Sequence, residues 1–157
     1  MVQIASGDGG GAILRKADGS AWSCSSYTPL LGRGEKYGTL NDALTPKPIP
    51  GLTKGVIDVA HGSSSMLALT EDGSVWTWGK NLDHTLDIIG LAYEHIQWTP
   101  KKTDLPVGPP MVDVEIDYSS TAFATRADGS VIVWGRQQQR RRRRRRPGVQ
   151  DRRRAHD

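Results

Sequence analysis

The sequence predicts an all-β chain that forms a partial β-propeller of about three antiparallel four-stranded blades, with a ring that this chain does not close. Three observations support this prediction. Sequence marks recur at a regular interval along the chain, each repeat holds short strand patterns, and each carries an Asp-Gly-Ser turn signal. Antiparallel four-stranded units that recur at such an interval are typical of propeller blades.

The clearest copy of the repeat lies in residues 56–79. Residues 57–59 alternate between apolar and polar side chains, residues 66–69 form a continuous apolar run, and residues 75–78 read Val-Trp-Thr-Trp. Such β-branched, aromatic and alternating patterns are typical of strands. Asp72-Gly73 separates the second and third runs, and Asp-Gly between apolar runs is a strong hairpin signal. The stretch therefore predicts three consecutive antiparallel strands.

The other marks recur in step with this copy. The first strand pattern begins at Val2, Ile57 and Val112, which are equally spaced, and the Asp-Gly-Ser triplets follow at nearly the same spacing. Thr-Pro pairs at 45–46 and 99–100 predict that a fourth strand follows them, and no apolar periodicity is long enough for a helix. The predicted units are residues 1–55, residues 56–110 and an incomplete unit at 111–135, followed by a disordered Arg-rich tail at 136–157.

These motifs resemble the regulator-of-chromosome-condensation repeat family. The second copy shows Val59-Ala-His-Gly62, Asp72-Gly73, Trp78-Gly79-Lys-Asn81 and Thr99-Pro100 in the order of the family's pattern. The first copy departs from that pattern, with Cys24-Ser25 where Trp-Gly is expected. The resemblance covers roughly residues 1–135 and implies a ring of seven blades, so the chain is interpreted as a fragment or truncated reading frame of a longer propeller. Assembly of several copies into a ring is the alternative, and the open blade edges would favour self-association.

The charge of the chain is unevenly distributed. Residues 136–157 hold 11 of the 21 Lys and Arg residues and two Asp, so residues 1–135 are net acidic. The single cysteine, Cys24, rules out an intramolecular disulfide framework and a multi-cysteine metal site. Neither a signal peptide nor a membrane span is visible, which favours the cytoplasm.

The residues that carry chemistry do not form a catalytic, cofactor or metal site by sequence. A calcium loop needs several carboxylates at alternate positions, whereas Asp18, Asp72 and Asp128 each stand in a turn with at most one acidic neighbour, so hairpin turns are the better interpretation. The four histidines make no closely spaced ligand pair, and residues 63–65 lack a nucleophile elbow. No enzyme activity and no cofactor are predicted.

Two regions are candidates for binding. Leu82 to Gln97 is an insertion between the second and third copies, and loops carry function more often than strands do. We expect His84, His95 and Trp98 to contact a protein partner there, whereas Trp76, Trp78 and Trp134, at strand spacing, are interpreted as packing residues. The second region is the tract Arg140, Arg141, Arg142, Arg143, Arg144, Arg145 and Arg146, which would bind a polyanion such as nucleic acid without sequence preference.

The function that these observations favour is a non-enzymatic protein-interaction scaffold. Two alternatives remain open at this point. The family resemblance implies guanine-nucleotide exchange on a small GTPase, and the arginine tract implies nucleic-acid binding through the tail. Neither alternative has a sequence feature that decides for it.

Overall fold

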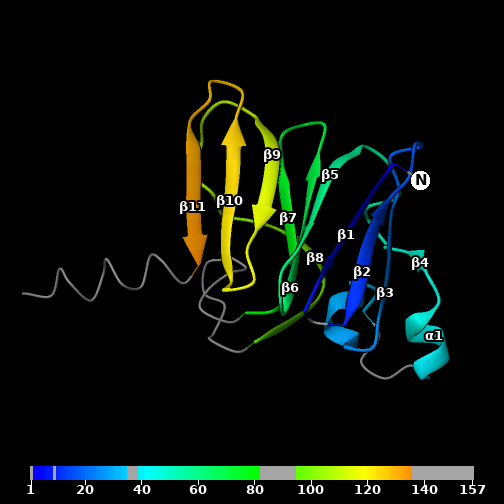
Figure 1. The fold of residues 1–157 in the computed structure, drawn as a ribbon. Helices are drawn as coiled ribbons and strands as arrows, with labels where there is room; N and C mark the ends of the chain where they lie inside the picture. Colours follow the sequence, from blue (N-terminus) through cyan, green and yellow to red (C-terminus); the bar gives the residue numbers. More distant parts are fainter. Residues whose placement is uncertain (1, 9, 35–38, 82–94, 136–157) are drawn as a thin grey trace, which may run out of the picture.

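The computed structural model describes residues 2–8, 10–34, 39–81 and 95–135. These residues form three antiparallel sheets that stand side by side (Figure 1), which we call blades 1, 2 and 3 in chain order. The all-β prediction and the open, partial propeller are confirmed. No helix among the described residues is long and apolar enough to cross a membrane.

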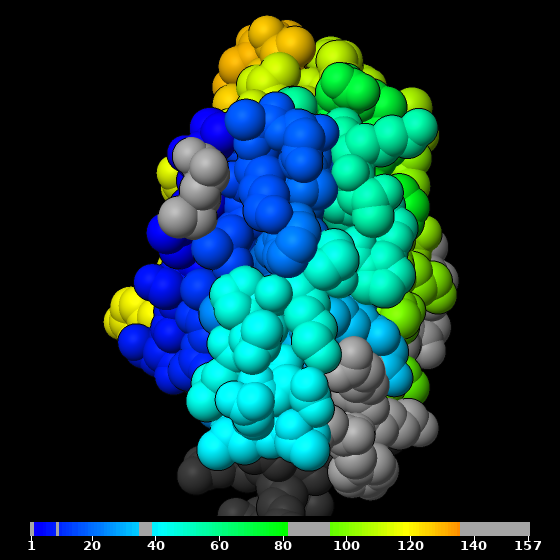
Figure 2. Space-filling view, turned by 90° about the vertical axis from the view of Figure 1, so that its right-hand side faces the viewer, coloured from blue at the N-terminus to red at the C-terminus, as the bar shows by residue number. Residues whose placement is uncertain are grey.

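Blade 1 is a four-stranded sheet in sequence order. Its strands are β1 (Gln3–Gly7), β2 (Gly11–Arg15), β3 (Ala21–Ser25) and β4 (Lys47–Pro48). A 3₁₀ turn, η1 (Thr28–Leu31), and a short helix, α1 (Leu40–Leu44), lie between β3 and β4. Seen from the blade 1 side in Figure 2, blade 1 (blue) forms one flank of the molecule and α1 (cyan) lies at its lower end.

The helix α1 is a feature that the sequence analysis did not predict. It is a single turn, too short to show an apolar period, and it begins at a local cap. The Thr39 hydroxyl accepts the backbone N–H of Asp42 at 3.2 Å, which satisfies one of the donors that a helix N-terminus leaves unpaired. Capping chemistry, not periodicity, therefore forms this element.

Blades 2 and 3 repeat the plan of blade 1. Blade 2 consists of β5 (Val56–His61), β6 (Ser65–Thr70), β7 (Val75–Lys80) and β8 (Ile96–Lys102). The described part of blade 3 consists of β9 (Met111–Ile116), β10 (Thr121–Arg126) and β11 (Val131–Gly135). The fourth strand was predicted after each Thr-Pro pair. This holds for β4. In contrast, β8 begins before its Thr-Pro pair and contains Thr99 and Pro100, because Ile96 and Gln97 already pair with Lys80 and Gly79 of β7.

The Asp-Gly-Ser triplets form the hairpin turns that the sequence predicts. In blade 2 the Asp72 carboxylate accepts the N–H of Ser74 at 3.0 Å and the hydroxyl of Thr70 at 2.6 Å. Gly73 has a φ of 77°, a left-handed conformation that favours glycine, and a Cβ there would lie 2.6 Å from Pro110 Cβ. The carboxylates of Asp18 and Asp128 likewise accept the N–H groups of Ser20 and Ser130. The same hydrogen bond therefore stabilises the corresponding hairpin turn in each of the three blades.

The hydrophobic core lies between the blades. A first cluster joins blades 1 and 2, and a second joins blades 2 and 3. Trp78 is fully buried in the first cluster, and its indole N–H donates to the Leu30 carbonyl of η1 at 2.9 Å. Trp134 is the matching buried residue of the second cluster. The prediction that Trp76, Trp78 and Trp134 are packing residues is thus confirmed, with Trp76 half-buried against the first cluster.

Replacing Trp78 by Phe tests the importance of this contact. The change leaves the buried Leu30 carbonyl without its donor and opens a void, so we expect the free energy of unfolding to fall by about 2–4 kcal/mol. Urea denaturation measures it.

The matched control is Trp76→Phe on the same strand. The indole of Trp76 is half-buried and bonds to the Thr70 hydroxyl at 3.2 Å within its own hairpin, so a loss of about 1 kcal/mol or less is expected. Equal losses in the two variants would contradict the assignment of Trp78 as the contact that joins the blades.

Candidate functional site

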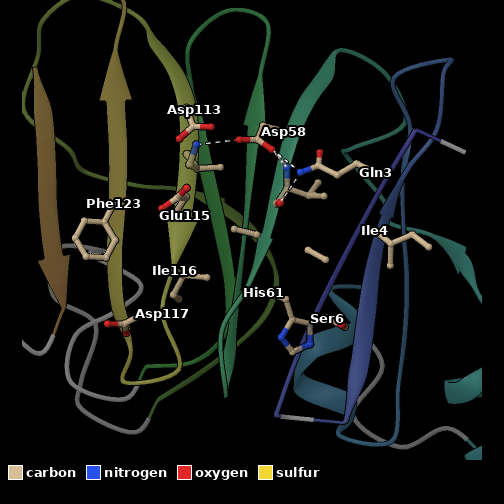
Figure 3. Close-up of a pocket in the computed structure, with 14 residues that line it drawn as sticks. Gln3, Ile4, Ser6, Asp58, His61, Asp113, Glu115, Ile116, Asp117 and Phe123 are labelled. Atoms are coloured by element: carbon tan, nitrogen blue, oxygen red, sulfur yellow. Dashed lines mark hydrogen bonds between the residues drawn. The ribbon is translucent and has the colours of Figure 1, made fainter. Parts of the chain in front are cut away.

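The innermost strands of the three blades, β1, β5 and β9, together form one surface (Figure 3). A hollow of about 540 Å³ lies over this surface and also reaches Phe123 of β10. Because the inner strands of a propeller line its central channel, this is the place where side chains from successive blades come together. We call it the inner-strand surface.

Asp58 of β5 links all three blades across this surface. One of its carboxylate oxygens accepts the side-chain amide of Gln3 at 2.7 Å, and the other accepts the backbone N–H of Val114 at 2.9 Å. Figure 3 shows both bonds. Hydrogen bonds to an ionised acceptor are stronger than neutral ones, so the carboxylate fixes blade 3 against blade 2 by a backbone bond.

The repeat places Gln3, Asp58 and Asp113 at equivalent positions of their inner strands. Asp113 therefore projects from blade 3 as Asp58 does from blade 2. Partial burial raises the pKa of Asp113 above its ordinary value of 3.8, and the negative charges of Asp58 and Glu115 raise it further. The pKa of Asp113 is thus raised first by desolvation and then by two neighbouring carboxylates of the inner-strand surface.

Two more acidic side chains of the third blade extend this charge. Glu115 is exposed on β9, and Asp117 follows directly after that strand. The Asp117 carboxylate accepts the N–H of Thr121 and the hydroxyl of Ser119, both at 2.8 Å. Among the described residues that line the hollow there is no lysine or arginine, so nothing in this lining neutralises the four carboxylates.

His61 closes the inner-strand surface at the end of β5. Its side chain is 7% exposed, and neither ring nitrogen has a hydrogen-bond partner among the described residues. Burial lowers the pKa of His61, so the imidazole is neutral at pH 7. A neutral imidazole offers one donor and one acceptor, and Figure 3 places it beside Ser6 at the edge of the hollow.

Of the residues that the sequence singled out for binding, only His95 and Trp98 lie in the part of the chain that the structure describes. Trp98 was placed in a loop insertion, but it lies half-buried in strand β8, because β8 starts at Ile96. His95 is exposed just before that strand, and its carbonyl accepts the N–H of Asn81 at 2.8 Å. His84 lies outside the described residues, as do Arg140 to Arg146. Partner binding by the two histidines and Trp98 and polyanion binding by the arginines stay predictions.

The three turn aspartates each stabilise a hairpin turn. The hydrogen bonds that Asp18 and Asp128 accept from Ser20 and Ser130 lower the pKa values of these two carboxylates. The pKa of Asp72 is lowered first by the bond from the Thr70 hydroxyl and then by the bonds from Ser74. Across the described ranges, no group of three or more His, Cys, Asp or Glu residues is arranged to hold a metal ion. The carboxylates of Asp18, Asp72 and Asp128 each stabilise their own hairpin turn.

The inner-strand carboxylates were missed by the sequence analysis. The available signal was the repeat itself, since a polar residue recurs at the second position of each inner-strand pattern, at Gln3, Asp58 and Asp113. Strand alternation predicts that such residues point to one face. It does not predict that Asp58 accepts a backbone N–H from the next blade, because that contact joins residues 56 positions apart.

Comparisons with known proteins agree with the fold. The model of the regulator of chromosome condensation (RCC1) repeat matches residues 56–84. The mouse E3 ubiquitin-protein ligase HERC2 is 33% identical over 138 residues, which are 86% of this chain and 3% of that protein. The X-linked retinitis pigmentosa GTPase regulator homolog of Caenorhabditis elegans is 33% identical over 85 residues, 54% of this chain and 6% of its own length.

A solved structure shows the same architecture. Prp20p from Saccharomyces cerevisiae matches with a TM-score of 0.72 at 20% identity, over 85% of this chain and 30% of that one. At this identity the likeness concerns the fold. The chain spans only a small part of each relative's length, from 3% to 30%.

The opposite pKa shifts of Asp113 and Asp72 predict opposite effects of amide substitution. The raised pKa of Asp113 means that its ionisation costs folding free energy above pH 3.8, so Asp113→Asn should raise stability at pH 7. The lowered pKa of Asp72 means that its ionisation favours folding above pH 3.8, so Asp72→Asn should lower stability at pH 7.

Thermal unfolding at pH 7 and pH 3 measures both effects. At pH 3 the gain in Asp113→Asn should disappear, because the carboxyl is protonated in the folded and unfolded states alike, and the deficit in Asp72→Asn should shrink. A stability loss in Asp113→Asn at pH 7 would refute the accumulation of negative charge on the inner-strand surface.

Proposed function

The chain is built from repeats of the regulator of chromosome condensation (RCC1) type, and from this premise we propose that it is a non-enzymatic protein-interaction scaffold. Its partner is a protein with a segment rich in lysine or arginine. The inner-strand surface receives that segment. Asp58, Asp113, Glu115 and Asp117 supply the charge that recognises it.

One observation carries this proposal: consecutive blades place carboxylates on a single hollowed surface whose described lining holds no basic residue. Complementary charge across an interface raises the association rate and selects the partner. A lysine or arginine side chain would also relieve the repulsion that raises the pKa of Asp113. An extended basic segment therefore fits this surface better than an acidic or neutral one.

Two further side chains give the surface specificity beyond charge. Phe123 lines the hollow beside the acidic strand β9 and offers an aromatic face for an aliphatic or guanidinium group. His61 bounds the hollow at the other end, where its two ring nitrogens are buried. Phe123 and His61 thus give the two ends of the surface different side chains, which favours one orientation of a bound peptide.

The relatives support protein binding in general. Prp20p was characterised for its binding to Gsp1p and histones, and a yeast RCC1 structure contains bound Kap60. These partners belong to those proteins. Guanine-nucleotide exchange remains the alternative hypothesis for this chain, and acceleration of nucleotide release from a small GTPase by the purified protein would favour it over the scaffold.

The scaffold proposal predicts that Glu115→Gln weakens binding of a fluorescent heptalysine peptide. Exposed charge pairs contribute about 0.2–1 kcal/mol each, so a rise of roughly 1.4- to 5-fold in Kd is expected at about 0.15 M salt. Fluorescence anisotropy with the full chain measures it. Binding should weaken further as salt rises, because added ions screen exposed charges.

Glu71→Gln is the matched control, since Glu71 is exposed in the β6–β7 turn and lies outside the inner-strand surface. Its substitution removes the same charge and should leave the Kd unchanged. Residues 136–157 are present in the wild-type chain and in both variants, so they do not bias the comparison of the three Kd values. Equal weakening in both variants would mean that net charge alone attracts the peptide and would overturn the assignment of the inner-strand surface.

A further inference from the structure

The linker between blades 2 and 3 leaves a pocket at a place that the linker between blades 1 and 2 fills. We call it the linker pocket. It has a volume of about 420 Å³ and lies between the turn after β6, the end of β8 and the linker at residues 103–110. Its apolar lining includes Val75, Leu105 and Met111, and it shares no residue with the hollow over the inner-strand surface.

Backbone hydrogen bonds establish which positions of the two linkers correspond. The Ile49 N–H donates to the Ala21 carbonyl at 2.9 Å. The Thr103 N–H donates to the Val75 carbonyl, also at 2.9 Å. Ala21 and Val75 each begin the third strand of their blade. Thr103 in the second linker therefore corresponds to Ile49 in the first.

The first linker buries two apolar side chains at this place, and the second does not. Ile49 and Leu52 are both 0% exposed and belong to the cluster that joins blades 1 and 2. In the second linker Thr103 replaces Ile49, and Pro106, at the position of Leu52, is exposed. Leu105 is only half-buried against the second cluster. The linker pocket is thus the space that Leu52 occupies one blade earlier.

A backbone donor is also left open at this pocket. The Ala21 N–H donates to the Leu52 carbonyl at 2.8 Å. Over the described ranges of the chain, the Val75 N–H at the same position of blade 2 has no backbone acceptor in the second linker. The Pro106 carbonyl instead accepts the Arg126 guanidinium. Because an N–H without an acceptor costs stability when it is buried, a carbonyl that enters the pocket gains a donor.

The side chain of Arg126 holds the second linker in this open course. Its guanidinium lies against Gly108 and leaves no room for a Cβ there. Thr70 is the corresponding residue of blade 2, since each of the two donates its N–H to the serine carbonyl of its Asp-Gly-Ser turn. The Thr70 hydroxyl bonds to Asp72 within its own hairpin. The contact that fixes the second linker is therefore specific to blade 3.

We propose that the linker pocket binds an uncharged turn of a partner protein that presents a leucine or isoleucine side chain. The described lining holds one acidic and one basic side chain, Asp72 and Lys102, and so carries no net charge, which matches an uncharged ligand. The apolar side chain fills the pocket as Leu52 fills the equivalent place, and the carbonyl of the same residue accepts the Val75 N–H. A buried aliphatic side chain is the kind of anchor on which small interfaces depend.

The first linker supplies the probe that tests this proposal. A peptide of residues 48–53, Pro-Ile-Pro-Gly-Leu-Thr, is uncharged when both ends are blocked. It therefore does not report on the proposed binding of a basic segment, and the two proposals can fail separately. In NMR spectra of the full chain, the peptide should shift the amide resonances of Val75 and Met111 saturably. A peptide with Leu52→Ser should bind about tenfold more weakly or worse, because it loses the burial of the leucine.

Variants of the full chain test the pocket itself. Leu105→Asp places a charge in the lining and should raise the peptide Kd about tenfold or more. Leu40→Asp makes the same change at a position that is 63% exposed on α1 and outside the pocket, so it should leave the Kd unchanged. Thermal unfolding checks that both variants fold, and Pro106→Asp at an exposed position of the lining repeats the test if Leu105→Asp does not fold.

Three outcomes would overturn the proposal. The first is the absence of a saturable shift at about 2 mM peptide, since weaker binding is below the range of specific recognition. The second is equal binding of the leucine and serine peptides. The third is equal binding by the folded lining variant and the Leu40→Asp control.

Discussion

The packing of one blade on the next is the constraint on which the rest of this structure depends. A four-stranded sheet has two faces, and the middle blade buries both of them against its neighbours. Trp78 shows how the contact is made, since its ring fills the first cluster while its N–H reaches the carbonyl of Leu30 in the preceding blade. An apolar side chain alone would leave that buried carbonyl unpaired, at a cost of about 1–3 kcal/mol.

The same constraint produces the charge on the inner strands. Because Asp58 fixes the neighbouring blade through the N–H of Val114, its side chain has to lie close to the strand that follows. The repeat then places Asp113 near it, and Glu115 adds a further charge. A feature that joins the blades thereby also prepares a surface for a cationic partner, so the packing of the fold and its proposed function share residues.

Much of the fold was predictable because its signals are local. Asp-Gly-Ser specifies a hairpin through bonds inside the triplet itself, and strand alternation specifies which side chains share a face. The errors arose where local signals are weak. The helix α1 is one capped turn, and β8 begins before its Thr-Pro mark, so Trp98 belongs to a strand and not to a loop. The candidate site was missed because its contacts join different repeats.

The sequence by itself determined the repeat, the hairpin turns, the packing role of the tryptophans and the all-β class, since each follows from residues close in the chain. Only the tertiary structure decided which side chains meet. The link from Gln3 through Asp58 to Val114 joins three successive repeats. Such contacts follow from how one blade sits on the next, and that arrangement is set by the packing of whole faces.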